Sequence, residues 1–115
     1  MAIKTIITEP NKILRQISNS VEHVGEEEQK LMDDMLETMY AAPGIGLAAI
    51  QIGIPKRIIV MDISREKENK NSLHFVNPEI VWKAGEEIIY EEGCLSVPNQ
   101  FAEINRPKEC HVKYL

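Results

Sequence analysis

The sequence predicts an α+β domain in which helices come first and antiparallel strands follow. Two observations support this class. One long segment near the N-terminus has apolar residues at helical spacing, and the segments after residue 56 are short, β-branched and bounded by proline, glycine or polar residues. No helical segment alternates with these strands, which excludes a doubly wound parallel sheet. With 115 residues, the chain is long enough for a single domain, residues 1–115.

The composition is that of an ordinary globular protein. Hydrophobic residues make up 43% and charged residues 27% of the chain, and the formal net charge is -5. This acidic balance argues against a nucleic-acid partner, since nonspecific binding to phosphates draws on a basic surface. No apolar run has signal or membrane-spanning length, so we expect a cytoplasmic protein with no membrane partner. Two cysteines, Cys94 and Cys110, do not indicate a disulfide framework.

Two helices are predicted. A brief one covers residues 12–18, and a longer one covers residues 26–40. The first turn of the longer helix carries three glutamates, which complement the helix dipole, and Pro43 and Gly44 mark its end. Its apolar residues form a stripe on one face that we assign to the core: Leu31, Met32, Met35, Leu36, Met39 and Tyr40.

The second half of the chain predicts strands. They are expected at residues 57–63, 73–82, 86–90, 101–104 and 109–115. Residues 64–72 are charged and polar, and we predict a hairpin-like connection there. These strands would pair antiparallel because no helix alternates with them.

Residues 44–51 form a Gly-rich segment. Gly44, Gly46 and Ala49 fit G-x-G-x-x-A, but that dinucleotide fingerprint has force only between a strand and a helix. Here a helix precedes and a strand follows, so we reject nucleotide binding. Small residues followed by the Gln51 amide suit a site where an extended peptide lies alongside the sheet. A tight helix-to-strand turn is an equally good interpretation.

Cys94 lies in a second dense segment, residues 91–98. It follows a glycine among polar residues, so we expect a loop, where a cysteine acts as nucleophile, metal ligand or small buried hydrophobe. No histidine shares a protease signature with Cys94. A zinc site from Cys94, Cys110 and His111 is disfavoured, since adjacent residues on a strand point to opposite faces.

Together the two segments resemble peptide deformylases. The family motif G-x-G-x-A-A-x-Q is matched at residues 44–51, and its second motif, E-G-C-L-S, is intact at residues 92–96. The resemblance extends from about Thr8 onward. One small departure is Ile50, where the family often has proline; the segment here would be less rigid.

The resemblance implies a hydrolase that removes the formyl group from the N-terminal formyl-methionine of newly made proteins. A divalent metal, usually ferrous iron in the cell and zinc or nickel after purification, would activate water. By the family pattern, Cys94 would be a metal ligand through its thiolate. The Gln51 amide and the backbone N–H of Leu95 would stabilise the developing oxyanion.

The resemblance also implies how the nascent peptide is held. Gly46 and Gly93 would pair with the substrate backbone as an added strand. Ile45 would help to line the pocket for the methionine side chain.

The family's third motif, H-E-x-x-H, supplies two histidine ligands and the general base from a helix. These 115 residues contain no H-E-x-x-H, and their last histidine is His111. We therefore expect a truncated deformylase-like domain that lacks the central C-terminal helix and has little or no activity alone. A non-catalytic peptide-binding module and an enzyme completed in trans by a separate polypeptide are the alternatives.

A missing central helix would leave apolar strand faces uncovered. We therefore expect the chain to form a homo-oligomer, to recruit a complementing polypeptide or to fold poorly.

Overall fold

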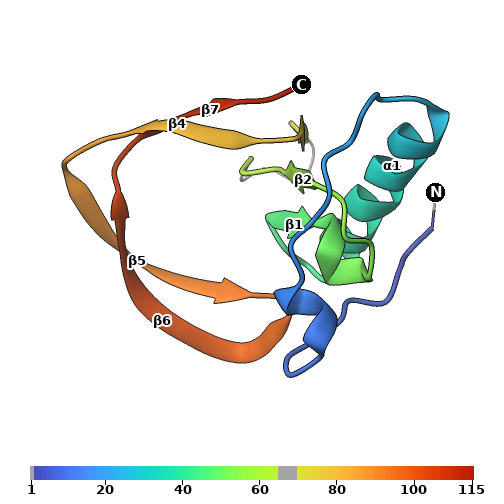
Figure 1. Cartoon of the computed structure of the whole chain (residues 1–115). Coiled ribbons are helices and arrows are strands. Elements are labelled where there is room, and N and C mark those ends of the chain that lie inside the picture. The colour runs from blue at the N-terminus through green and yellow to red at the C-terminus, as the bar shows by residue number, and fades with distance from the viewer. Residues whose placement is uncertain (1, 65–69) are drawn as a thin grey trace.

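A computed structural model describes residues 2–64 and 70–115 of the chain. Figure 1 shows one long helix beside a small sheet, with two longer pairs of strands curving away from them. No helix among the described residues is both long and apolar enough to cross a membrane. In chain order the elements are the 3-10 helix η1 (Lys12–Arg15), α1 (Glu26–Ala41), β1 (Gly46–Ala48), the 3-10 helix η2 (Ala49–Ile52), β2 (Ile58–Met61), β3 (Leu73–Val76), β4 (Glu79–Lys83), β5 (Glu87–Cys94), β6 (Val97–Pro107) and β7 (Cys110–Lys113).

The long helix α1 forms where the periodicity predicts it. At its start the side chain of Glu28 accepts a hydrogen bond from the Gly25 N–H at 3.0 Å, which satisfies one of the free donors of the first turn. It ends at Ala41, just before the Ala42–Pro43 bond. Met35 and Met39 are fully buried on the face that packs against β1 and β2.

The core lies between α1 and a three-stranded antiparallel sheet of order β1-β2-β3. Alternate residues of β2 point into it, as in Ile58 and Val60, each 1% exposed. The predicted antiparallel α+β class is thus confirmed. The buried apolar residues are Val21, Leu31, Met32, Met35, Met39, Leu47, Ala49, Ile58, Val60 and Val76.

The strand predicted at residues 73–82 is in fact two strands. Asn77 adopts a left-handed backbone, with φ 53°, and Pro78 follows it, so the chain turns between β3 and β4. The Asn77 amide also accepts from the Val21 N–H at 2.8 Å and donates to the Val21 carbonyl at 2.7 Å. These contacts hold the N-terminal segment against the sheet.

Two further strand pairs, β4–β7 and β5–β6, complete the fold, and both are antiparallel. The pair β5–β6 is a long hairpin whose register runs from Glu87 opposite Pro107 to Cys94 opposite Val97. Its strands are longer than the predicted segments 86–90 and 101–104. Backbone pairing continues through polar residues whose sequence pattern does not predict a strand.

The predictions for the short segments were less accurate. The helix expected at residues 12–18 is the single 3-10 turn η1, where the Asn11 side chain accepts from the Ile13 N–H at 3.0 Å. Of the predicted connection at residues 64–72, residues 65–69 lie outside the part that the structure describes.

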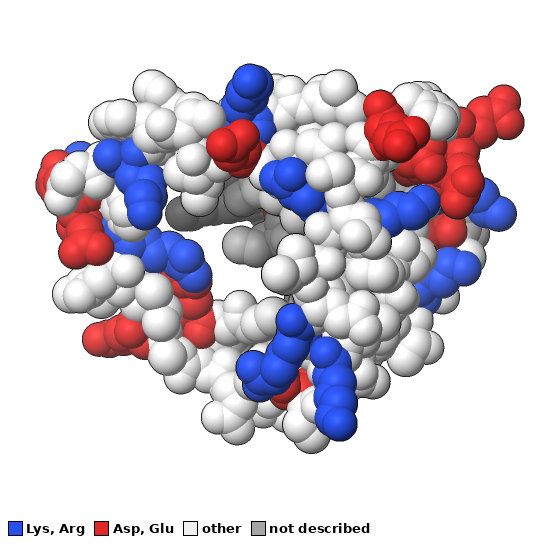
Figure 2. Space-filling view, in the orientation of Figure 1, with Lys and Arg blue, Asp and Glu red and all other residues white. Residues whose placement is uncertain are grey.

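The outer strand pairs leave many apolar side chains exposed. Figure 2 shows that this face of the molecule is hollowed between these strands and the body that contains α1. All residues of β4 and β7 are exposed. Large exposed apolar side chains on the two strand pairs are Ile80, Val81, Trp82, Ile88, Ile89, Tyr90, Phe101 and Val112.

Candidate functional site

A groove of about 940 Å³ lies between the start of β1 and the turn of the β5–β6 hairpin. It brings together both segments that the sequence singled out, which are about 40 residues apart in the chain. Most of its walls are apolar or backbone. The residues that line it are Ile6, Ala42, Pro43, Gly44, Ile45, Gly46, Gln51, Tyr90, Glu91, Glu92, Gly93, Cys94, Leu95, Val97, Pro98, Asn99, Gln100 and Phe101.

Gln51 is the polar centre of the groove. Its Oε1 accepts a hydrogen bond from the Ala48 N–H at 2.9 Å, which fixes the orientation of the amide. Its Nε2 donates to the Cys94 Sγ at 3.5 Å and to the Ser96 Oγ at 3.1 Å. One N–H of the amide therefore points to the thiol and the other to Ser96, so the amide is held with a donor facing the groove.

The sequence predicted a loop at Cys94, but this prediction was wrong: Cys94 is the last residue of the strand β5. Pairing continues up to the residues Leu95 and Ser96, which make the hairpin turn, and the register shifts between Gly93 and Cys94. Such a bulge re-aims a side chain. The Cys94 thiol is exposed in the groove.

Ser96 is a residue to which the sequence analysis assigned no role. It is 4% exposed, accepts from Gln51 through its hydroxyl, and accepts from the Glu9 N–H through its carbonyl at 2.8 Å. Ser96 therefore ties the hairpin turn to both Gln51 and the N-terminal segment. Its position two residues after Cys94 in a dense polar motif was the only signal in the sequence.

One wall of the groove is the edge strand β1. Gly46 pairs with Met61 of β2 on one side, and in the sheet order β1-β2-β3 the other edge of β1 carries no strand of the described chain. A free backbone edge beside a groove can pair with an extended peptide. Ile45, 69% exposed, lies at the start of this wall.

Asp62 fixes the backbone at Ile45, in the connection between α1 and β1. The Asp62 N–H donates to the Ile45 carbonyl at 2.9 Å, and its carboxylate accepts from the hydroxyls of Ser64 and Tyr40, each at 2.6 Å. The Ser64 and Tyr40 hydrogen bonds lower the pKa of Asp62 to about 2. Burial, together with the neighbouring Asp62, raises the pKa of Tyr40 to about 12.

Two glycines of the groove are closely covered by side chains. A Cβ at Gly44 would come within 2.7 Å of the Leu95 Cδ1, and one at Gly93 within 2.7 Å of the Phe101 Cε1. Glycine at position 44 therefore lets the segment after α1 approach the hairpin turn, and glycine at position 93 leaves room for the Phe101 ring within the β5–β6 hairpin.

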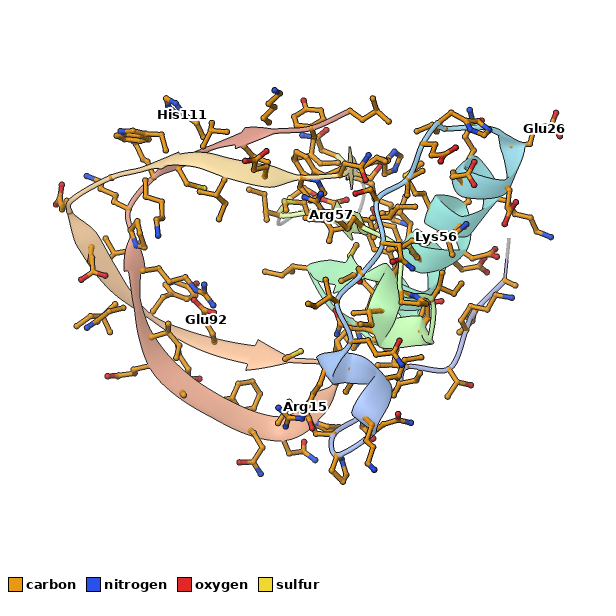
Figure 3. The ribbon with its side chains drawn as sticks, in the orientation of Figure 1. Arg15, Glu26, Lys56, Arg57, Glu92 and His111 are labelled. Atoms are coloured by element: carbon orange, nitrogen blue, oxygen red, sulfur yellow. The ribbon has the colours of Figure 1, made fainter. Side chains whose placement is uncertain are left out.

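The other wall carries an ion pair. Arg106 of β6 donates through both Nε and Nη2 to the Glu92 carboxylate of β5, the second contact at 2.7 Å. This bidentate contact lowers the pKa of Glu92. Figure 3 shows Glu92 pointing from the hairpin into the space that the strands enclose.

The described residues do not form a complete metal site. No group of three histidine, cysteine, aspartate or glutamate side chains within residues 2–64 and 70–115 could hold an ion. Cys110 and His111 lie on β7, in a different sheet from Cys94, and His111 stacks on Trp82 at 4.6 Å between ring centroids. Cys94 thus supplies one sulfur donor where catalytic zinc sites have three protein ligands.

Comparison with known proteins identifies relatives of the whole chain. The family model for polypeptide deformylase matches residues 3–115. Peptide deformylase of Pelagibacter ubique is 70% identical over 115 residues, which are 100% of this chain and 67% of that protein. The protein of the same name from Phenylobacterium zucineum is 58% identical, with 100% of this chain and 68% of the relative covered.

Solved structures of peptide deformylases also match this chain in fold. The crystal structure of the Ehrlichia chaffeensis peptide deformylase in complex with actinonin is 44% identical, with a TM-score of 0.93 over 100% of this chain and 69% of that one. The Legionella pneumophila peptide deformylase is 45% identical, with a TM-score of 0.91 over 99% and 66%. The chain thus spans about two thirds of the length of these relatives. Sequence, fold and the pairing of Gln51 with Cys94 all agree that this chain belongs to the peptide deformylase family.

Proposed function

We propose that this chain binds formyl-methionyl peptides in the groove and supplies the oxyanion-stabilising half of a deformylase centre. The observation that carries the proposal is the Gln51 amide, which reaches the Cys94 thiol and Ser96 from a segment 43 residues away. Two local motifs thus place an amide donor beside a thiol in one groove, where a donor can stabilise the oxyanion that forms when the formyl amide is hydrolysed.

The roles of the groove residues follow from their positions. The free edge of β1 at Gly46 would pair with the substrate backbone, and Gly93 would do so from the opposite wall. Ile45 would contact the methionine side chain, since it is exposed at the same end of the groove.

The formyl carbonyl would be polarised by two donors. Gln51 Nε2 already faces the thiol, and the backbone N–H of Leu95 follows Cys94 directly in the chain. Donors held in place before the reaction stabilise an oxyanion without reorganisation. The Leu95 side chain lies close to Gly44, where a Cβ would come within 2.7 Å of its Cδ1.

Residues 1–115 would not turn over substrate by themselves. The family is generally metal-dependent, with Fe²⁺, Zn²⁺ or Ni²⁺ expected here, yet the described residues offer the single donor Cys94. One thiolate leaves a divalent ion weakly held. An H-E-x-x-H segment would add the missing donors, so hydrolysis would need this segment in addition to residues 1–115.

The test measures bound metal and hydrolysis of formyl-Met-Ala-Ser. We expect residues 1–115 to bind the peptide, to retain less than stoichiometric metal and to release no formate. On addition of a synthetic polypeptide that carries an H-E-x-x-H helix, metal retention and formate release should appear together. Stoichiometric metal with turnover by residues 1–115 alone would contradict the proposal.

The chain offers a matched pair of variants. Cys94→Ser should abolish metal retention in the mixture, because it removes the sulfur donor of the groove. Cys110→Ser, the other exposed cysteine, should leave it unchanged since Cys110 lies on β7. Peptide binding without turnover in the mixture would instead indicate a non-catalytic binding module.

A further inference from the structure

The N-terminal residues Ile7 and Glu9 connect the two segments that form the polar centre of the groove. The Ile7 N–H donates to the Gln51 carbonyl at 2.7 Å, and the Glu9 N–H donates to the Ser96 carbonyl at 2.8 Å. Figure 1 shows this part of the chain, in blue, beside the end of the β5–β6 hairpin. One short piece of backbone thus reaches both η2 and the hairpin turn.

The length of this piece limits how far the two contacts can separate. Two residues span at most about 7 Å, so the two N–H groups keep the Gln51 and Ser96 carbonyls close to each other. Among residues 2–64 and 70–115, the direct hydrogen bonds between η2 and the hairpin turn both come from the Gln51 side chain. The backbone of Gln51 is therefore hydrogen-bonded to the hairpin only by way of residues 7–9 in this part of the chain.

Side chains hold residues 7–9 in place outside the polar centre. The Ile7 side chain lies against Gly53, which ends η2, and a Cβ at Gly53 would come within 3.1 Å of the Ile7 Cδ1. The Glu9 carboxylate accepts from the Arg15 Nη2 of η1 at 3.2 Å. Residues 7–9 therefore have contacts of their own with η1 and η2, independent of the Gln51 side chain.

The position of the Gln51 amide is sensitive to this support. Its Nε2 reaches the Cys94 Sγ at 3.5 Å, from the end of a side chain with several rotatable bonds. A displacement of about 1 Å is enough to impair a group that stabilises a transition state. If one N–H were lost, a backbone carbonyl would lose its partner, and η2 and the hairpin turn could move apart.

We propose, on the basis of the function proposed above, that Ile7 and Glu9 are positioning residues for the deformylase centre. Their backbone N–H groups hold the Gln51 amide donor at the Cys94 sulfur. The role belongs to the N–H groups and not to the charge of the Glu9 side chain.

The test removes one N–H at a time. The hydroxy-acid counterpart of a residue, incorporated by nonsense suppression, replaces its peptide N–H with an ester oxygen and keeps its side chain. Esters at Ile7 and at Glu9 remove the two contacts separately. An ester at Asn19 is the matched control, because the Asn19 N–H also donates at 2.8 Å, but to the Pro55 carbonyl, outside the groove. Glu9→Gln keeps the N–H and removes the charge.

NMR of the unliganded chain reports where the Gln51 side chain lies. The parent should show a nuclear Overhauser effect between the Gln51 Nε2 protons and the Cys94 Cβ protons. In the Ile7 and Glu9 esters this effect should weaken, and exchange of the Gln51 side-chain protons with water should quicken about 2- to 10-fold, the size of one lost hydrogen bond. The Asn19 ester should lower the urea midpoint to a similar extent but, like Glu9→Gln, leave both Gln51 signals as in the parent.

Unchanged Gln51 signals in both esters, or an equal change in the Asn19 ester, would overturn the inference. If neither ester folds, native-state hydrogen exchange of the parent decides. The Gln51 side-chain protons should then lose protection at the same urea concentration as the Ile7 and Glu9 N–H groups. Protection of Gln51 that persists after these two N–H groups have opened would contradict the proposed support.

Peptide binding separates this inference from the proposed function. Formyl-Met-Ala-Ser should bind the Ile7 and Glu9 esters about 2- to 10-fold more weakly than the parent, and the Asn19 ester as tightly as the parent. If the parent itself does not bind the peptide, the proposed function is wrong, and the Gln51 signals of the unliganded chain still decide whether Ile7 and Glu9 position the amide.

Discussion

Glycine at position 44 is required by packing across the groove. The Leu95 side chain lies where a Cβ would be, and Leu95 is the residue whose N–H we assign to the oxyanion. The contact joins the segment after α1 to the hairpin turn, two parts of the chain that local sequence does not connect. A methyl group at position 44 would therefore act on both stability and the proposed centre.

Gly44→Ala should displace Leu95 and destabilise the chain by about 1 kcal/mol, at the lower end for overpacking because the contacted atom ends a flexible side chain. Peptide binding should weaken as well. Gly85→Ala is the control, since a Cβ at Gly85 has nothing within 4 Å. Urea unfolding and peptide titration measure the two effects. Equal stability and binding in the two variants would show that Leu95 moves freely.

Asp62 links α1, β2 and the groove wall through one carboxylate. Tyr40 and Ser64 donate to it, and its own N–H holds Ile45. Because its pKa falls from the ordinary value of 3.8 to about 2 in the folded chain, the charged form is favoured by folding.

The stabilisation from Asp62 is therefore present above pH about 3.8 and is lost as the pH falls toward about 2. Asp62→Asn should lower the urea midpoint at pH 5, and its difference from the parent should shrink as the pH falls toward 2. Asp33→Asn, at an exposed carboxylate on α1, should show no such trend. A difference between Asp62→Asn and the parent that is constant with pH would rule out this linkage.

At the scale of elements, a single side chain helps to fasten the N-terminal segment to the end of β3, in addition to backbone hydrogen bonds such as that of the Asn19 N–H to the Pro55 carbonyl. The Asn77 amide makes both a donor and an acceptor contact with the backbone of Val21. Its left-handed backbone also creates the turn that separates β3 from β4. One residue thus divides a predicted strand and fastens a segment 56 residues away.

Asn77→Ala should destabilise the chain by about 2–4 kcal/mol, from two lost hydrogen bonds and an alanine in the left-handed region. Asn77→Gly should cost about 1–3 kcal/mol, because glycine adopts this backbone freely. Asn99→Ala is the matched control: Asn99 has φ 61° but is exposed in the β5–β6 hairpin. If Asn77→Ala and Asn99→Ala cost the same, the Val21 contacts contribute little.

At the scale of the whole molecule, the core lies between α1 and the sheet β1-β2-β3, with Val21 and Ala49 added from the neighbouring segments. The pairs β4–β7 and β5–β6 are stabilised mainly by their own ladders and expose large apolar side chains. Exposed apolar patches of this kind mark surfaces that bind another chain.

Residues 1–115 should therefore bind a hydrophobic dye and sediment as a concentration-dependent mixture of species. Ile88→Gln, on the β5–β6 pair, should reduce both effects. Ile17→Gln should not, although Ile17 is 94% exposed, because it lies outside the strand pairs. A monodisperse monomer without dye binding would contradict this expectation of a homo-oligomer or a complementing partner.

Local pattern was sufficient for much of the fold. Apolar periodicity predicts the helix α1, and β-branched runs predict the strand β2 and the antiparallel class. Both patterns depend only on residues that are neighbours in the sequence. Two motifs in the right order were also enough to indicate the family, and Gln51 and Cys94 were named from them.

The tertiary structure alone decided how these parts meet. Contacts within the folded chain determine where several residues lie. They place Cys94 at a strand end, bury Ser96, divide residues 73–82 at Asn77 and bring the Phe101 ring close to Gly93. Periodicity reports which face of an element is apolar, but not which other element covers it. That is settled only when the closed chain satisfies packing and backbone hydrogen bonds together.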